Sequence, residues 1–151
     1  MTSDLFSERF KFSAWPNPSI PAVAAGVYAI WKDKELIYCG MSGREIDSKG
    51  KTTSKKYGLI TRLNSHASGR LSGDQFCVYV ANRFVVPTIN PEELSHFASG
   101  NLTLDKRTKA FIHMHFDYAY ALVQRSADAF ALERLARTGH IFGRKPYLNP
   151  L

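Results

Sequence analysis

Two short apolar and aromatic segments, residues 26–30 (GVYAI) and residues 36–40 (LIYCG), constrain the fold more than any other part of the sequence. Each has the length of a strand, and the charged residues 32–35 (KDKE) separate them. Two such runs joined by a short polar turn predict a β-hairpin. Tyr28 and Tyr38 lie one on each run. Because side chains alternate along a strand, both hydroxyls can face the same side of the hairpin.

The rest of the sequence alternates between helical and strand-like patterns. Prolines in residues 1–25 preclude a long helix, so we expect an N-terminal arm that packs its aromatic side chains onto the core. Helices are predicted over residues 57–67, 90–100, 103–115 and 126–138, and further strands over residues 76–86 and 116–123. This order predicts an α+β fold with a small, mostly antiparallel sheet flanked by helices.

Length and composition place the chain in a simple class. A sequence of 151 residues suits a single domain, residues 1–151, with one core. No apolar run approaches the roughly 20 residues that cross a bilayer, and the N-terminal segment lacks the basic and apolar regions expected of a secretory signal. Cys39 and Cys77 are too few for a disulfide framework and lack metal-ligand spacing, so we expect buried thiols. These features predict a cytoplasmic protein without a membrane partner.

The charge of the chain favours a polyanionic partner. Twenty Lys and Arg against thirteen Asp and Glu give a net charge of +7. Basic proteins bind nucleic acids because neutralising phosphates releases condensed counterions, although a soluble protein can also be basic without such a partner. Residues 41–57 are rich in lysine and poor in apolar residues, and predict a flexible basic loop. Its lysines either track a DNA backbone or are simply solvated; they are Lys49, Lys51, Lys55 and Lys56. Lys56 and Tyr57 are also candidates to enter a nucleic-acid-binding cleft.

Three later segments complete a pattern with the hairpin. They are residues 58–66 (GLITRLNSH), residues 131–135 (ALERL) and residues 147–150 (YLNP). With the G-V-Y and Y-C-G of the hairpin, this ordered set resembles the GIY-YIG nuclease superfamily, from Gly26 to Asn149. Val27 and Cys39 replace the isoleucines of the two signatures, a change that we expect to alter packing and spare chemistry. The resemblance implies a three-stranded sheet and identifies residues 41–57 as an insertion.

The resemblance also implies roles for the hairpin tyrosines and the first helix. Tyr28 matches the proposed general base, and Tyr38 matches the tyrosine that donates a hydrogen bond toward the phosphate or its water. A free tyrosine titrates near 10, but a neighbouring Mg²⁺ and Arg62 would lower that pKa. Arg62 has a forked cation suited to phosphate oxygens, and His66 lies one turn later on the same face, where it can relay a proton. Ordinary surface and packing roles are the alternatives for both.

Glu133 and Asn149 complete the implied site. Glu133 stands beside an apolar helical stripe and matches the metal ligand of the family, whereas the residues alone favour a surface glutamate near Arg134 or Arg137. A Mg²⁺ or Mn²⁺ site can use a single carboxylate, because water and substrate phosphate fill the other positions. Asn149 matches the terminal asparagine, expected to brace the hairpin backbone.

The function implied is that of a divalent-metal-dependent DNA endonuclease, an enzyme that hydrolyses phosphodiester bonds. Cutting both strands with one active site requires either a homodimer or successive nicking, and the sequence does not choose between them. An alternative is a catalytically inactive, basic nucleic-acid-binding module with the same fold. A small RNA-binding protein is a third alternative, although no ribonucleoprotein-type aromatic signature supports it.

Overall fold

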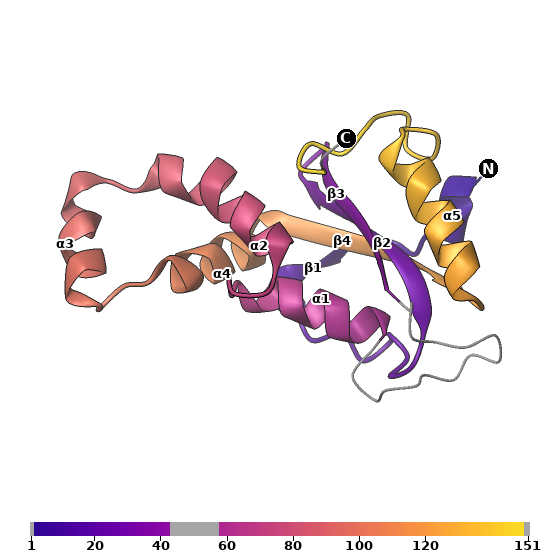
Figure 1. Cartoon of the computed structure of the whole chain (residues 1–151), viewed down its shortest axis with the longest axis horizontal. Helices are drawn as coiled ribbons and strands as arrows, with labels where there is room; N and C mark the ends of the chain where they lie inside the picture. The colour runs from indigo at the N-terminus through magenta and orange to yellow at the C-terminus, as the bar shows by residue number, and fades with distance from the viewer. Residues whose placement is uncertain (1, 43–57, 150–151) are drawn as a thin grey trace.

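Four antiparallel strands form the centre of the molecule, in the order β1-β4-β2-β3 (Figure 1). The structure is a computed structural model that describes residues 2–42 and 58–149. The strands are β1 (Phe10–Lys11), β2 (Ala25–Lys32), β3 (Glu35–Ser42) and β4 (Phe116–Val123). The α+β class expected from the sequence is therefore confirmed, with a sheet that lies between helices.

The predicted hairpin is present as β2 and β3. Its register pairs Tyr28 with Gly40 and Ile30 with Tyr38. Tyr28 and Ile30 are two residues apart, so their side chains share one face of the sheet, and the register places Tyr38 on that face too. Asp33 makes the turn with a φ of 55°, a conformation that aspartate tolerates better than most residues. The strand β3 extends to Ser42, so Met41 and Ser42 belong to the sheet and not to the predicted loop.

Two expectations about the strands are wrong. The sheet has four strands and not three, because Phe10 and Lys11 of the N-terminal segment pair with Tyr118 and Asp117 of β4. Residues 76–86 are helical: α2 (Gln75–Val80) continues into a π-helical turn (Ala81–Val85) and a 3₁₀ turn (Val86–Thr88). A short apolar run does not distinguish a buried strand from a buried helix, and here the Asp74 side chain caps the first turn by accepting from the Cys77 N–H.

The other predicted helices are confirmed, with local signals at their ends. They are α1 (Leu59–Ser68), α3 (Pro91–Ser99), α4 (Leu104–His115) and α5 (Ser126–Arg137). Asn90 and Glu93 form a reciprocal capping box at the start of α3, and Thr103 caps α4. Gly69 ends α1 with a φ of 71°, where a Cβ would also overlap the backbone of Lys109. Two short 3₁₀ turns lie in the N-terminal segment, at Thr2–Leu5 and Phe12–Ala14.

Alternation along β2 divides the core between the two faces of the sheet. Val27 and Ala29 pack with α5 on one face. Tyr28 and Ile30 point to the opposite face, into the larger core cluster that α1, α2 and α4 cover (Figure 1). The N-terminal segment contributes the fully buried Phe12 to this cluster, and its Trp15 donates a hydrogen bond to Asn64 of α1. The hairpin is thus enclosed on both sides.

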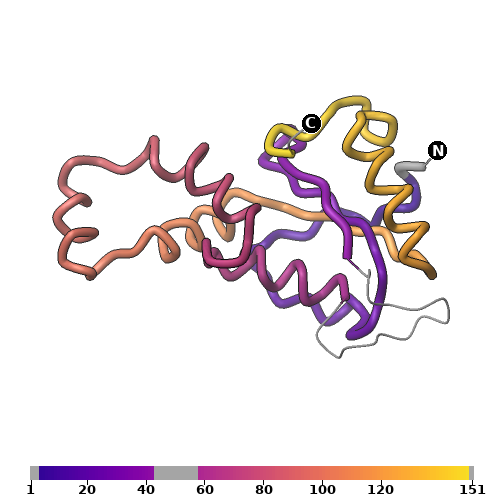
Figure 2. Tube along the Cα trace, viewed as in Figure 1, coloured from indigo at the N-terminus to yellow at the C-terminus, as the bar shows by residue number. Residues whose placement is uncertain are grey.

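The two ends of the molecule differ in shape. The segments α2, α3 and α4 form an extension with α3 at its tip, far from α5 (Figures 1 and 2). The C-terminal segment instead returns to the sheet, where the backbone N–H groups of Tyr147 and Leu148 donate to the carbonyls of Leu36 and Ile37 on the outer edge of β3. Among the residues that the structure describes, no helix has the length and apolar character needed to cross a bilayer.

Candidate active site

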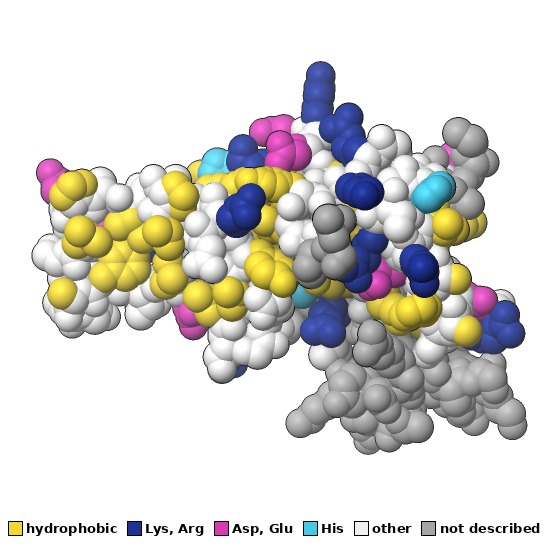
Figure 3. All heavy atoms as spheres, turned by 45° about the horizontal axis from the view of Figure 1, so that its top comes forward, with side chains coloured by type: hydrophobic (Ala, Val, Ile, Leu, Met, Phe, Trp, Pro, Cys, Tyr) yellow, Lys and Arg dark blue, Asp and Glu magenta, His cyan; other side chains and the backbone are white. Residues whose placement is uncertain are grey.

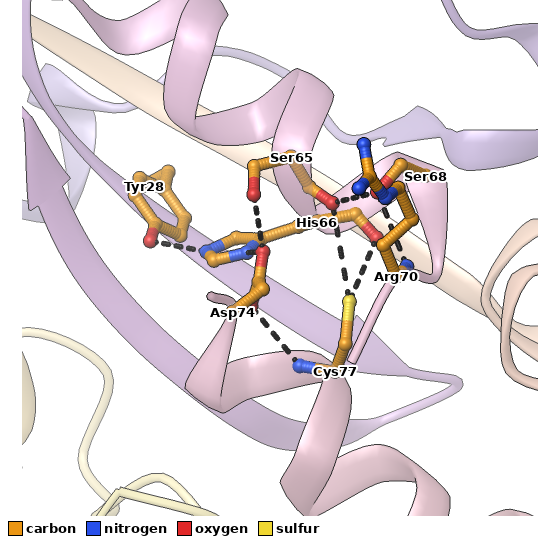
Figure 4. Close-up of polar contacts among 7 residues, drawn as sticks. All are labelled: Tyr28, Ser65, His66, Ser68, Arg70, Asp74 and Cys77. Carbon is orange, nitrogen blue, oxygen red and sulfur yellow. Dashed lines mark hydrogen bonds and ion pairs between the residues drawn. The ribbon is translucent and has the colours of Figure 1, made fainter. Parts of the chain in front are cut away.

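A buried hydrogen bond joins Tyr28 of the hairpin to the first helix. The Tyr28 hydroxyl lies 2.6 Å from Nε2 of His66. Tyr28 is 1% exposed and His66 is 2% exposed, so this contact is shielded from solvent. Figure 4 shows the phenol reaching from β2 to the imidazole on α1. The structure therefore brings together two residues that lie 38 positions apart in the sequence.

Asp74 continues this chain of contacts and was not among the predicted site residues. Its Oδ2 lies 2.7 Å from Nδ1 of His66 and accepts a hydrogen bond of 2.6 Å from the Ser65 hydroxyl (Figure 4). Its Oδ1 accepts from the backbone N–H of Cys77 at 3.1 Å. The only sequence signal was an aspartate two residues before the apolar run that begins at Phe76, which is a helix N-cap pattern and does not reveal its second partner.

Tyr38 forms the more exposed wall of the same cluster. Its ring centroid lies 6.4 Å from that of Tyr28 and 5.9 Å from that of His66, with an interplanar angle of 86° to the imidazole. Phe76 of α2 packs against both, with centroids 5.1 Å from Tyr38 and 4.6 Å from His66. Because Tyr38 is only partly buried, it is the phenol that a molecule outside the protein would meet first.

The absence of a side chain at Gly40 makes room for Tyr28. A Cβ atom at Gly40 would overlap the phenol oxygen and Cζ of Tyr28. The absence of a side chain at Gly40 is therefore explained by Tyr28, which stands opposite it in the hairpin register. This close approach fixes where the Tyr28 hydroxyl points.

The charges of Arg62 and Glu133 both act on the two phenols. Burial raises the pKa of Tyr28 well above its usual value; Tyr38, Asp74 and Glu133 raise it further, and only Arg62 lowers it. Burial likewise raises the pKa of Tyr38, which Arg62 lowers and Glu133 raises. The guanidinium thus acts in the expected direction, but burial outweighs it in the protein alone. The lowering expected from Arg62 together with a bound Mg²⁺ stays a prediction. Both charged residues lie near enough to influence the hairpin.

His66 and Asp74 have opposite ionisation tendencies. Burial lowers the pKa of His66, although the hydrogen bond and charge of Asp74 raise it. Burial raises the pKa of Asp74, but the hydrogen bonds from His66, Ser65 and the Cys77 N–H outweigh burial and lower it to about 2. At neutral pH the pair is therefore a neutral imidazole and an ionised carboxylate.

The terminal asparagine fastens the C-terminal segment to β3. The Asn149 side chain accepts from the Cys39 N–H at 2.7 Å and donates to the Cys39 carbonyl at 2.9 Å. It therefore pairs with the strand as another strand would, one residue beyond Tyr38. This is the bracing contact that the sequence suggested for Asn149. Ala136 of α5 also packs against Cys39, on the side of β3 that faces away from Tyr28.

A cavity of about 380 Å³ opens between α5 and the C-terminal segment. Glu133 and Asn149 form part of its wall, and the other lining residues are Phe130, Arg134, Arg137, Thr138, Lys145 and Pro146. Glu133 is 16% exposed, and its Oε1 lies 3.6 Å from the Arg137 guanidinium. Figure 3 shows Lys and Arg side chains distributed over this part of the surface, whereas hydrophobic side chains gather at the opposite end. The cavity is therefore rich in positive charge.

The basic loop of the predicted site falls in a part of the chain that the structure does not describe. Lys49, Lys51, Lys55, Lys56 and Tyr57 lie outside the described residues, as does the rest of residues 43–57. Within the described part of the chain, no group of three or more His, Cys, Asp and Glu side chains gathers in the manner of a metal site built by protein ligands alone. The two cysteines, Cys39 and Cys77, are buried free thiols as expected.

Comparison with known proteins identifies no relative. No family model matches the sequence, and neither a curated protein nor a solved structure matches the chain. Any function must therefore be argued from the residues themselves.

Proposed function

We propose that this protein is a divalent-metal-dependent DNA endonuclease of the GIY-YIG type, and that its hairpin, helices and sheet are a variant of that fold. The observation that carries the proposal is the contact between Tyr28 and His66, in a cluster on which Arg62 and Glu133 both act. Phosphodiester hydrolysis needs a base for the attacking water and cations for the developing phosphate charge. These residues supply both within one region.

In the proposed reaction each side chain has a separate task. Tyr28 takes the proton of the attacking water, with His66 assisting it. Arg62 binds the phosphate oxygens, and its forked guanidinium matches them better than a lysine would. Tyr38, the more exposed phenol, donates a hydrogen bond to the phosphate. Asn149 holds the β3 backbone next to Tyr38 and so keeps that phenol in position.

Glu133 is the residue that fits a divalent cation. It presents a single carboxylate at the wall of an open cavity, which suits Mg²⁺ or Mn²⁺, since these ions keep several waters and share the substrate phosphate. When bound, the cation would neutralise phosphate charge and favour ionisation of water. Arg137 lies beside the same carboxylate and neutralises part of its negative charge in the protein alone.

The cavity beside Glu133 gives the nucleic-acid backbone a place to lie. It is lined by Arg134 and Arg137 of α5 and by Lys145 of the C-terminal segment, so two segments of the chain contribute positively charged side chains. Phosphate groups flanking the cleaved one would neutralise them, with release of counterions. A homodimer or successive nicking by one protomer would each allow both strands to be cut.

One observation favours the alternative, a nucleic-acid-binding module without turnover. Tyr28 is 1% exposed and burial raises its pKa, so in this arrangement its hydroxyl neither contacts bulk water nor ionises readily. A protein that only binds DNA would need no access to that hydroxyl. The Arg and Lys side chains of the cavity would then serve only to bind DNA.

A plasmid assay separates the two functions. Supercoiled DNA is incubated with the protein and Mg²⁺ or Mn²⁺, with and without chelator, beside Glu133→Ala and Arg62→Ala. Glu92→Ala and Lys106→Ala are matched controls, because both residues are exposed and lie outside the site. The enzyme predicts metal-dependent nicking that the two site variants lose and the controls keep. Binding in a gel-shift assay without nicking in any metal would instead support the module.

A further inference from the structure

Asp74 has one carboxylate oxygen for its helix cap and another for the candidate site. Oδ1 accepts from the Cys77 N–H at the start of α2, which is sufficient for capping. Oδ2 is directed to Ser65 and His66 of α1, at 2.6 Å and 2.7 Å (Figure 4). Asp74 is 3% exposed, so each of these contacts replaces water that the carboxylate has lost.

These contacts decide which nitrogen of His66 carries the proton. An ionised carboxylate only accepts hydrogen bonds, so the imidazole nitrogen facing Asp74, Nδ1, must be the donor. In a neutral imidazole the other nitrogen is then an acceptor. That nitrogen is Nε2, which faces the Tyr28 hydroxyl at 2.6 Å. The phenol therefore donates to the imidazole, and the direction of the whole chain follows from the charge of Asp74.

We propose that Asp74 is a positioning residue that holds His66 in the Nδ1-protonated tautomer, so that Nε2 receives the Tyr28 proton during catalysis. The proton-transfer role rests on the proposed nuclease function. In that step the Tyr28 O–H bond breaks, its electron pair stays on the phenolate oxygen, and an N–H bond forms at Nε2. Asp74 stays ionised and neutralises the imidazolium. The phenolate is then the base that accepts the water proton.

The other groups around His66 act on the two partners of this transfer differently. The guanidinium of Arg62 lowers the pKa of the phenol, which favours the phenolate, and lowers the pKa of the imidazole, which opposes the imidazolium. Tyr38 and Phe76 pack against the ring and bring no charge at neutral pH. Asp74 is the group that raises the His66 pKa and so prepares it to accept a proton.

Replacing Asp74 by asparagine separates the cap from the positioning role. In Asp74→Asn the amide oxygen can still accept from Cys77, while its NH₂ group would face Nδ1 of His66. Two donors cannot share that contact, so the imidazole changes to the Nε2-protonated tautomer and no longer accepts from Tyr28. Ser65→Ala is the matched control, because it removes one hydrogen bond from Asp74 but leaves the carboxylate.

Nitrogen-15 NMR of the imidazoles tests the tautomer directly. The His66 resonances are assigned by their absence in His66→Gln. We expect Nδ1–H with an unprotonated Nε2 in the wild type and in Ser65→Ala, and the reverse in Asp74→Asn. An Nε2–H tautomer in the wild type would overturn the proposal even if Asp74→Asn fails to fold. An unchanged tautomer in a folded Asp74→Asn would overturn it too.

Cleavage kinetics test the consequence. We expect Asp74→Asn to lose activity on the order of 10⁴-fold, the scale of a catalytic histidine held in the wrong tautomer, and Ser65→Ala to lose much less. Asp74 raises the His66 pKa, so the Asp74→Asn substitution should lower that pKa. The acid limb of the pH profile of the variant's residual activity should therefore move to lower pH, which loss of a helix cap alone would not cause. Full activity in Asp74→Asn would refute the positioning role. An inactive wild type with the expected NMR tautomer would refute the nuclease function and leave the tautomer assignment standing.

Discussion

Substituting Gly40 by alanine should displace Tyr28 without touching any charged residue. The added Cβ would overlap the Tyr28 phenol oxygen and Cζ, and the phenol has no room to retreat because His66 contacts it at 2.6 Å. Overpacking a core costs about 1–3 kcal/mol, and loss of the buried hydrogen bond adds about 1 kcal/mol. We therefore expect Gly40→Ala to lower the free energy of unfolding by about 2–4 kcal/mol.

Gly100→Ala is the control for Gly40→Ala. Nothing lies within 4 Å of a Cβ at Gly100, but its φ of 83° makes alanine strained, at about 1–2 kcal/mol. Denaturant unfolding measures both losses, and plasmid nicking measures activity. Gly40→Ala should lose nicking and Gly100→Ala should keep it under conditions in which both are folded. If Gly40→Ala unfolds at the wild-type denaturant midpoint and nicks normally, the close contact with Tyr28 is not a feature of the folded protein.

Other perturbations have distinct expected outcomes. Asn149→Ala removes both hydrogen bonds to Cys39 and should cost about 1–3 kcal/mol in denaturant unfolding; a cost near zero would mean that the C-terminal segment is not fastened there. Stability should fall on acidification, first below the unfolded His66 pKa of 6.5, because burial lowers its folded pKa. It should fall again between the unfolded Asp74 pKa of 3.8 and its folded value of about 2, by on the order of 2 kcal/mol in total. A smaller loss of unfolding free energy below pH 3.8 in Asp74→Asn than in the wild type would assign that second loss to Asp74, and equal losses would contradict it. Glu133→Gln should keep DNA binding in a gel shift but lose metal-dependent nicking; equal nicking would exclude Glu133 as the metal ligand.

Local sequence patterns were sufficient to predict the elements whose structure is determined by short-range signals. The hairpin follows from two apolar runs around a charged turn, and α3 follows from Asn90, Pro91 and the acidic residues after them. The strand β1 is too short for any periodicity, since only Phe10 and Lys11 pair with β4. For residues 76–86 the apolar pattern is compatible with strand or helix, and packing between α1 and α4 decides for helix.

The candidate site was predictable residue by residue but not in its electrostatics. Tyr28 and His66 were expected to act together, and a hydrogen bond joins them. Asp74 was missed because its contact with His66 depends on how the turn at Gly69 and Gly73 folds α2 back against α1. The burial of Tyr28, which raises its pKa, depends on packing from three helices and the sheet, and no local pattern reveals it.

The central claim is that the Tyr28 hydroxyl takes part in phosphodiester hydrolysis. Single-turnover cleavage of an end-labelled DNA duplex in Mg²⁺, by the wild type and by Tyr28→Phe, tests it most directly, because the substitution removes one oxygen and keeps the ring. General-base catalysis contributes about 10²–10⁴-fold, so the rate constant should fall by at least about 100-fold in a variant whose circular dichroism is unchanged. Equal rate constants for the two proteins, or a wild type that leaves the duplex intact, would contradict the claim.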